Sequence, residues 1–336
     1  MRQQTIRTMA LATGVAAFAA IAPASAADIK MAFFASPKHH VWADFMEPWG
    51  KAMENAGVGI KVLGFPGSQI GGKPPGAFKR VVNGISHVEF GLQGYTSTVF
   101  PKTMIAEIPM QFENAVEATR GLWRILDKHL SNEYSRVKVL GLWTTDTPVL
   151  MTNKTVRTPA DLAGVKLRTP SRDQAEIIKQ LGAIPVAMPM PATYTAIEKG
   201  VVDGALVGIS VVASFKLAEV VKNYVTGLPM GFSPQMVVMN RKVYNGLNAA
   251  QKKTIDDSTG LEWSLRAAKL YEESRVSGLK LVRDRKDTTL TELTPAQRKI
   301  WDAKFKEISD SWVGRFEKAG FKNYSEILAD YLGKGS

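Results

Sequence analysis

Short apolar segments alternate with amphipathic helical patterns along most of the chain. A strand is predicted over residues 29–34, a helix with apolar residues at helical spacing over 42–53, and a second strand over 59–63. The same alternation continues over 87–92, 115–129 and 137–143. Strands that are separated by helices pair in parallel, so the pattern predicts an α/β fold.

The segment 158–204 shows this alternation most clearly. Thr158-Pro159 predicts the start of a short helical turn, and a strand is expected over 165–168. Helices are expected next over 170–182 and 192–199. Arg168 therefore stands at the carboxyl end of a predicted strand and faces the start of a helix. Open α/β sheets bind their ligands at that edge.

The last third of the chain carries long, charged amphipathic helices. They are predicted over 249–277 and 295–319, with a short strand-like segment over 288–293 between them. The first helix is long enough to run across two lobes. No flexible linker separates the parts of the chain, so the chain is expected to cross between its lobes more than once.

Residues 1–26 have the pattern of a secretory signal. Arg2 and Arg7 precede an apolar stretch over 9–21, and the segment ends with Ala24-Ser25-Ala26, which predicts cleavage after Ala26 and a periplasmic protein. No paired arginines and no cysteine point to the twin-arginine route or to a lipid anchor. No later segment approaches the roughly 20 apolar residues that a membrane-spanning helix needs.

The 310 residues that remain (336 less 26) suit two domains of about 150 residues each. One lobe is predicted over 27–147 plus about 238–280, and the other over 148–237 plus about 281–336.

Composition narrows the possible chemistry. The chain has no cysteine, which excludes disulfide scaffolds, thiolate metal sites and cysteine nucleophiles. Without Arg2 and Arg7 the 43 basic residues become 41 against 31 acidic ones, a net charge of about +10. This charge favours an anionic ligand or an acidic partner, although scattered basic residues also fit a solvated surface. A nucleic-acid partner is not expected in the periplasm.

No catalytic or metal-binding motif is present. The four histidines lack the H-E-x-x-H spacing, and G-x-S-x-G, Walker A and G-x-G-x-x-G patterns are all missing. We therefore predict no catalytic residue, no metal and no cofactor. His39 and His40 follow the first predicted strand at the expected cleft edge, where a ligand contact and a structural pair are both possible.

A run of ordered motifs then points to a family. The motifs are Asp161–Pro170 (DLAGVKLRTP), Leu181–Met188 (LGAIPVAM), Tyr194 and Gly200–Gly204 (GVVDG). In this order and spacing they resemble the solute-binding proteins of TRAP transporters, of the DctP type, and weaker similarities such as Pro66–Gln69 extend over most of the chain. The resemblance implies a periplasmic binding protein-like fold, with two α/β lobes, a hinge of crossing strands and a long lobe-spanning helix.

The resemblance also implies a function. Such a protein captures a small organic acid and delivers it to the small and large integral membrane subunits of its transporter. The arginine at the position of Arg168 forms a two-pronged salt bridge with the ligand carboxylate, for which a planar guanidinium offers paired donors. A structural ion pair is the alternative role for Arg168. A binding protein of another tripartite carboxylate transporter or of a sensor, or a periplasmic enzyme, remain alternative functions.

Two departures from the family pattern bear on specificity. Trp143 stands where many sugar-acid binders have a second arginine, and Ala205-Leu206-Val207 replaces a polar position after the Asp-Gly pair. Because unpaired buried hydroxyls would cost about 1–3 kcal/mol each, a monocarboxylate with an apolar or aromatic body is expected. Ordinary core packing is the alternative for each aromatic residue. The predicted ligand-binding residues are Arg168, Trp143, Tyr95, Phe34, His39, Ser171, Met190, Val207, Gly208 and Phe232.

Overall fold

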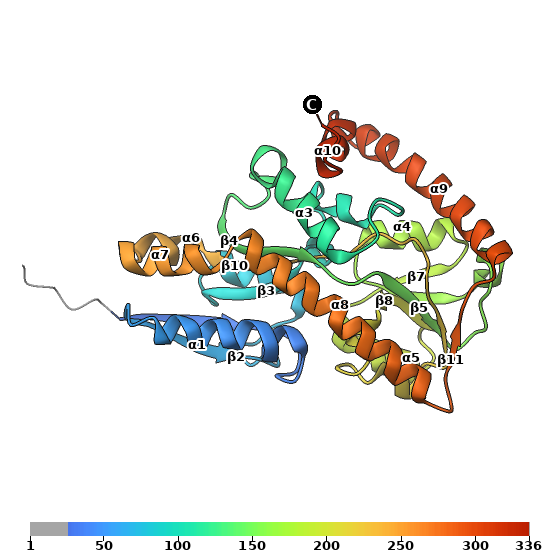
Figure 1. The fold of residues 1–336 in the computed structure, drawn as a ribbon, viewed down its shortest axis with the longest axis horizontal. Helices are drawn as coiled ribbons and strands as arrows, with labels where there is room; N and C mark the ends of the chain where they lie inside the picture. Colours follow the sequence, from blue (N-terminus) through green and yellow to red (C-terminus); the bar gives the residue numbers. More distant parts are fainter. Residues whose placement is uncertain (1–25, 336) are drawn as a thin grey trace, which may run out of the picture.

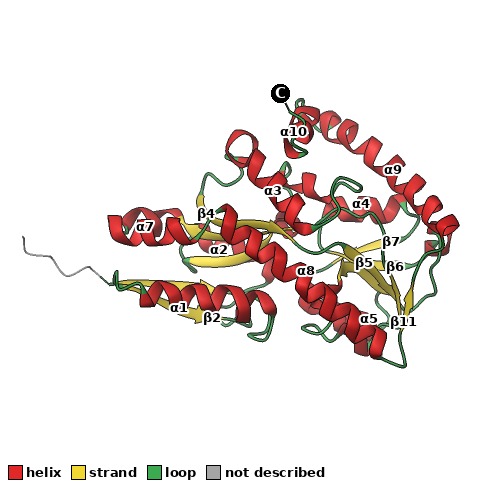
Figure 2. Cartoon of the chain, in the orientation of Figure 1, coloured by secondary structure: helices red, strands yellow, loops and turns green. Residues whose placement is uncertain are grey.

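The computed structural model describes residues 26–335 and arranges them in two sheets flanked by helices (Figures 1 and 2). The first sheet has the strand order β2-β1-β3-β10-β4. Its strands are β1 (Ala27–Ala32), β2 (Ile60–Phe65), β3 (Val88–Leu92), β4 (Val137–Thr144) and β10 (Pro234–Asn240). β1 pairs in parallel with β2 and β3, whereas β10 lies antiparallel between β3 and β4.

The second sheet has the order β11-β9-β5-β8-β6-β7. Its strands are β5 (Pro148–Thr152), β6 (Lys166–Thr169), β7 (Ile184–Ala187), β8 (Gly204–Gly208), β9 (Asn223–Val225) and β11 (Thr289–Thr291). β6 pairs in parallel with β7 and β8, and β5 is antiparallel to β8 and β9. Both sheets thus combine parallel strands with antiparallel strands from distant parts of the chain.

Helices cover the two sheets and connect them. They are α1 (Glu47–Asn55), α2 (Ala77–Val82), α3 (Ala115–Ile125), α4 (Arg172–Gln180), α5 (Thr193–Glu198), α6 (Arg241–Gly246), α7 (Ala249–Ser258), α8 (Leu261–Asp284), α9 (Pro295–Lys318) and α10 (Tyr324–Tyr331). Figure 1 shows α8 running from the first sheet to the second. The chain also passes between the sheets from β4 to β5 and from β9 to β10. The predicted fold class is confirmed.

Several strands were not predicted, and the clearest case is β10. All seven of its residues are buried, so it shows none of the apolar and polar alternation by which a half-exposed strand is recognised. The helix predicted over 249–277 is also wrong in one respect, since it consists of α7 and α8 with a break at Gly260. Gly260 has a φ of 91°, which favours glycine over any other residue.

The predicted lobe boundaries stay a prediction, but two features bear on them. β10 belongs entirely to the first sheet, so a boundary between residues 237 and 238 falls inside a strand. The last helix also returns to the first lobe, because Arg124 Nη2 on α3 donates to Tyr331 O on α10 at 2.6 Å. Figure 1 shows α9 leading from the second sheet back toward α3.

The predicted signal segment lies, except for its last residue, outside the described residues. Among the helices of residues 26–335, none combines the length and the apolar character that crossing a bilayer requires.

The lobe-spanning helix can be tested at Gly278. A Cβ at this position would lie 2.4 Å from the Ile209 carbonyl oxygen, where α8 crosses the second lobe. Gly278→Ala should therefore lower the free energy of unfolding by about 1–3 kcal/mol, the range for overpacking. Gly314→Ala in α9 is the matched control, because nothing lies within 4 Å of its Cβ and alanine should stabilise the helix by up to about 1 kcal/mol. Urea denaturation of both variants measures this, and equal effects would contradict the close crossing.

Candidate ligand-binding site

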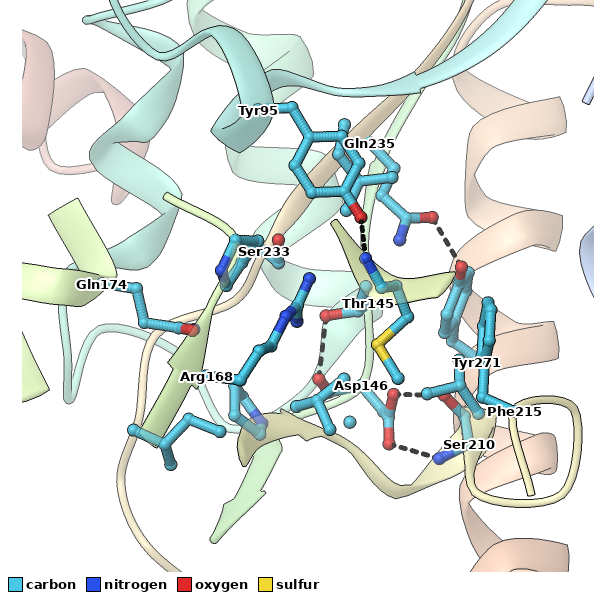
Figure 3. Close-up of a pocket in the computed structure, with 18 of the residues that line it drawn as sticks. Tyr95, Thr145, Asp146, Arg168, Gln174, Ser210, Phe215, Ser233, Gln235 and Tyr271 are labelled. Atoms are coloured by element: carbon cyan, nitrogen blue, oxygen red, sulfur yellow. Dashed lines mark hydrogen bonds between the residues drawn. The ribbon is translucent and has the colours of Figure 1, made fainter. Parts of the chain in front are cut away.

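A cavity lies between the two sheets, and α8 closes one side of it (Figure 3). The first sheet and its loops contribute Phe34, His39, Phe90, Leu92, Tyr95, Thr145, Asp146, Ser233 and Gln235. The second sheet and its loops contribute Pro148, Arg168, Pro170, Gln174, Met190, Leu206, Val207, Gly208, Ser210, Val211 and Phe215, and α8 contributes Tyr271. In this closed arrangement the cavity is small, about 50 Å³.

Arg168 is the cation of this cavity. Side chains alternate between the faces of β6, so Leu167 enters the core while Arg168 faces the cavity. Its Nε donates to Met188 O at 3.0 Å, and its buried Nη2 has no hydrogen-bond partner among the described residues. Burial lowers the pKa of Arg168, while Tyr95 and Glu107 act in the opposite direction. Within residues 26–335, Arg168 forms no ion pair, and its side chain is only 2% exposed.

Two contacts join the opposite walls of the cavity. Tyr95, from the loop after β3, accepts a hydrogen bond from Met190 N of the second lobe at 2.9 Å. The His39 and Phe215 rings meet edge to face, with centroids 5.7 Å apart. Each contact joins a residue of the first lobe to a residue of the second. Both contacts would therefore have to break for the cavity to open.

His39 and its neighbour His40 are uncharged imidazoles. Burial lowers the pKa of His39 well below its usual value, with a further contribution from His40, and burial lowers the pKa of His40 to about 4. His39 Nδ1 accepts a hydrogen bond from Val41 N at 3.2 Å. In a neutral ring this places the proton on Nε2, so His39 can offer an N–H donor to the cavity.

Asp146 is a cavity residue that sequence reasoning missed. Ser210 donates to both of its oxygens, from Oγ to Oδ1 at 2.6 Å and from N to Oδ2 at 3.2 Å. A Cβ at Gly208 would lie 1.9 Å from Oδ1, so only glycine leaves room for this carboxyl. Burial raises the pKa of Asp146 to about 7. Its position three residues after the predicted strand 137–143 was a usable signal, because ligand groups collect at the carboxyl ends of strands.

β10 and α8 supply further polar groups that were not predicted. The buried Ser233 Oγ lines the cavity without a hydrogen-bond partner among the described residues. Tyr271 Oη donates to Gln235 Oε1 at 2.6 Å, which leaves the Gln235 amide N–H groups as donors. Ser233, directly before β10, and Gln235 on it were missed because β10 itself was not recognised as a strand.

Seven of the ten predicted residues line the cavity, and their contact with a ligand stays a prediction. Those seven are Phe34, His39, Tyr95, Arg168, Met190, Val207 and Gly208. Trp143, Ser171 and Phe232 do not line it. The expected place of Trp143 is corrected: its side chain is fully buried behind Phe90, with ring centroids 5.9 Å apart.

Ser171 and Phe232 are corrected for similar reasons. Ser171 Oγ caps α4 by accepting from Gln174 N at 2.9 Å, and it donates to Glu107 Oε2 at 2.6 Å. Phe232 is buried in the core, and its backbone N donates to Ala106 O at 2.7 Å. Ser171 thus links the two lobes through Glu107, Phe232 belongs to the core, and neither forms the cavity wall.

A family model described as bacterial extracellular solute-binding protein, family 7, of the DctP type, matches residues 31–315. The chain belongs to this family. The TRAP solute-binding resemblance is therefore confirmed, and the family consists of binding proteins of transporters rather than enzymes.

Individual relatives agree with this membership. The 2,3-diketo-L-gulonate-binding periplasmic protein YiaO of Escherichia coli K12 is 26% identical over 259 residues, which cover 76% of this chain and 77% of YiaO. The C4-dicarboxylate-binding periplasmic protein DctP of Rhodobacter capsulatus is 28% identical over 182 residues, covering 52% of this chain and 53% of DctP.

Solved structures are similar over nearly the whole chain. A TRAP solute-binding protein from Rhodoferax ferrireducens T118, in complex with copurified benzoate, has a TM-score of 0.86 at 26% identity and covers 91% of this chain and 97% of its own. A marine metagenome TRAP solute-binding protein specific for aromatic acids, in complex with 3-hydroxybenzoate, has a TM-score of 0.87 at 28% identity, covering 92% and 98%.

Glu107 gives this solute-binding protein a testable pH dependence. Burial, with a smaller contribution from Asp173, raises the pKa of Glu107 from 4.5 to about 8, although Ser171 acts against the shift. The folded state therefore holds this proton more tightly than the unfolded state. The resulting stability is complete below pH 4.5 and is lost as the pH rises toward 8.

The side chain of Glu107→Gln cannot ionise. The free energy of unfolding of this variant, relative to that of the wild type, should therefore be higher at pH 8 than at pH 5. The gain should exceed about 1 kcal/mol, because one pKa unit corresponds to about 1.4 kcal/mol. Urea denaturation at both pH values measures it. Glu113→Gln, at an exposed position, is the control and should follow the wild-type profile. A constant difference between Glu107→Gln and wild type at the two pH values would show that Glu107 is not buried as an acid.

Proposed function

We propose that this family-7 protein is secreted through residues 1–26, binds a small monocarboxylate with an apolar or aromatic body through Arg168, and delivers it to the membrane subunits of a TRAP transporter. The observation that carries this proposal is the buried guanidinium of Arg168, which faces the cavity without a carboxylate partner among the described residues. A buried charge is costly unless it is paired.

A ligand carboxylate would supply that pairing. Arg168 Nε is already engaged with Met188 O, whereas Nη2 is buried and unpaired. Charge-assisted hydrogen bonds from a guanidinium to a carboxylate are roughly twice as strong as neutral ones. Ser233 Oγ and the Gln235 amide are further donors that line the same cavity from the first lobe. The cavity therefore concentrates donors for one anionic group.

The rest of the cavity favours an apolar body. Its walls include Phe34, Phe90, Leu206, Val207 and Phe215, which offer no hydrogen bonds to sugar hydroxyls. The two solved relatives described above, at 26% and 28% identity, hold benzoate and 3-hydroxybenzoate. The polarity of the walls and the ligands of these relatives together support an aromatic monocarboxylate as the first ligand to test.

The anchoring role of Arg168 can be measured with benzoate. Arg168→Ala should weaken benzoate binding by about 2–5 kcal/mol, the range for truncating one partner of a buried charge pair. Arg168→Lys should recover only part of this loss, because an ammonium cannot present paired planar donors. Titration calorimetry gives the affinities, and Arg120→Ala, on the exposed face of α3, should bind benzoate like the wild type. Unchanged affinity in a folded Arg168→Ala variant would contradict the proposal.

Closure of the lobes is the second test of this function. A ligand held between two lobes is fully desolvated only when both lobes close on it, and the contacts Tyr95–Met190 and His39–Phe215 join the two walls. Small-angle scattering should show a smaller radius of gyration after benzoate is added to the wild type and no change in Arg168→Ala. An identical radius with and without saturating benzoate would argue against a clamp.

A further inference from the structure

We propose that Asp146 is a specificity residue, which selects monocarboxylates that carry a hydroxyl group and rejects those that carry a second carboxylate. The proposal rests on the function proposed above, in which Arg168 holds the ligand carboxylate. It concerns the opposite end of the same cavity. In Figure 3, Arg168 and Ser233 lie on one side of the cavity, and Asp146, Ser210 and Phe215 lie on the other.

The structure builds a defined place for the Asp146 carboxyl. Its side chain is completely buried, Ser210 donates to each of its oxygens, and Gly208 leaves space where any Cβ would collide with Oδ1. Each carboxylate oxygen can accept a further hydrogen bond, since a carboxylate has about four lone-pair sites. Asp146 therefore has acceptor capacity toward the cavity beyond what Ser210 uses.

No cation neutralises Asp146 within residues 26–335. Asp146 takes part in no ion pair with a described residue, and Arg168 in the same cavity is not paired with it. The groups that act on it are Ser210, from the loop after β8, and Glu272 and Arg275, at a distance on α8. Nearby His39 is a neutral imidazole. A hydrogen-bond donor on the ligand would therefore be the strongest available stabilisation of this carboxylate.

A hydroxyl fits this place better than an ammonium. An ammonium brings three donors into the cavity, whereas a hydroxyl brings one. On this side of the cavity Ser210, whose hydroxyl already donates to Asp146, lies near the apolar Phe215, so few acceptors remain there for additional donors. The neutral His39 ring could in addition donate from Nε2 to the hydroxyl oxygen, because Nδ1 accepts from Val41 N. A ligand hydroxyl can thus donate its one hydrogen bond to Asp146, whereas an ammonium at the same place would have N–H groups without an acceptor.

The same carboxyl works against a second carboxylate. Two carboxylates that share a poorly hydrated site repel each other, and one of them ionises only at a raised pKa. This repulsion should weaken the binding of any ligand whose second carboxylate lies where the hydroxyl would otherwise lie, next to Asp146. Asp146, rather than Trp143, is therefore the residue that discriminates against dicarboxylates.

The test uses matched benzoate derivatives at pH 7.5 and titration calorimetry. The probes are benzoate, 3- and 4-hydroxybenzoate, isophthalate, terephthalate, and 3- and 4-(aminomethyl)benzoate. In the wild type, the hydroxybenzoate isomer that binds more tightly should bind at least fivefold tighter than benzoate. The dicarboxylate with its second acid group at the same ring position should bind at least tenfold more weakly than benzoate. In Asp146→Asn, which keeps the shape but not the charge, the hydroxyl preference should fall below twofold and the relative affinity of the dicarboxylate should rise at least tenfold. Asp44→Asn, at an exposed position, should keep the wild-type ratios.

A measurement on the wild type alone covers the case in which Asp146→Asn fails to fold. Burial raises the pKa of Asp146 to about 7, so between pH 6 and pH 8 the hydroxybenzoate preference should increase and the relative affinity of the dicarboxylate should decrease. His39 stays neutral over this range. Glu107 also titrates in this range, but its contact residue Ser171 does not line the cavity. Any effect of Glu107 on the carboxylate that all probes share is the same for each probe, so it cancels when the affinities of two probes are divided.

The outcomes separate the two proposals. Loss of binding of all the probes in Arg168→Ala, together with unchanged ratios in Asp146→Asn, would overturn the role of Asp146 alone. Tightest binding of an aminomethylbenzoate or of a dicarboxylate to the wild type would also overturn it. Absence of binding by every probe, or binding that does not depend on Arg168, would overturn the proposed function and with it the role of Asp146.

Discussion

The burial of one guanidinium between two lobes is the interaction on which the site depends. Arg168 is buried, its Nε donates to the Met188 carbonyl, and its Nη2 has no hydrogen-bond partner among the described residues. Such a cation raises the free energy of the closed form unless an anion enters the cavity. In the proposed function, closing of the lobes and binding of a carboxylate are therefore coupled, because each makes the other more favourable.

The residues around Arg168 keep its charge uncompensated. Burial raises the pKa of Glu107 to about 8 and lowers the pKa of the cavity residue His39 well below its usual value, so the acid is mostly protonated and the imidazole is neutral near pH 7. Tyr95 accepts from Met190 N and adds no charge. The cavity thus presents a single cation against apolar walls, with the Asp146 carboxyl as a separate acidic group that Ser210 holds in place.

Local patterns were sufficient where the chemistry is local. The strand before Arg168, the capped turn at Thr158 and the helix after Ser171 follow from residues within a few positions of each other, and all three are found. Trp143 shows the limit of this reasoning. Its position in the chain was close to the site, but its buried ring packs against Phe45 and Phe90 and does not line the cavity. A sequence motif can locate the end of a strand, but it cannot show whether a side chain there lines the cavity or is buried in the core.

By itself the sequence determined the α/β class, the family and the place of Arg168 at the end of a strand, because strand and helix periodicity and a contiguous motif are properties of neighbouring residues. Only the tertiary structure decided which groups complete the cavity. Ser233 and Gln235 enter it because β10 pairs between β3 and β4, far from its neighbours in the chain. Asp146 meets Ser210 across 64 positions because Gly208 leaves space for its carboxyl. Long-range strand pairing and close packing set these contacts, and neither is encoded in any short segment.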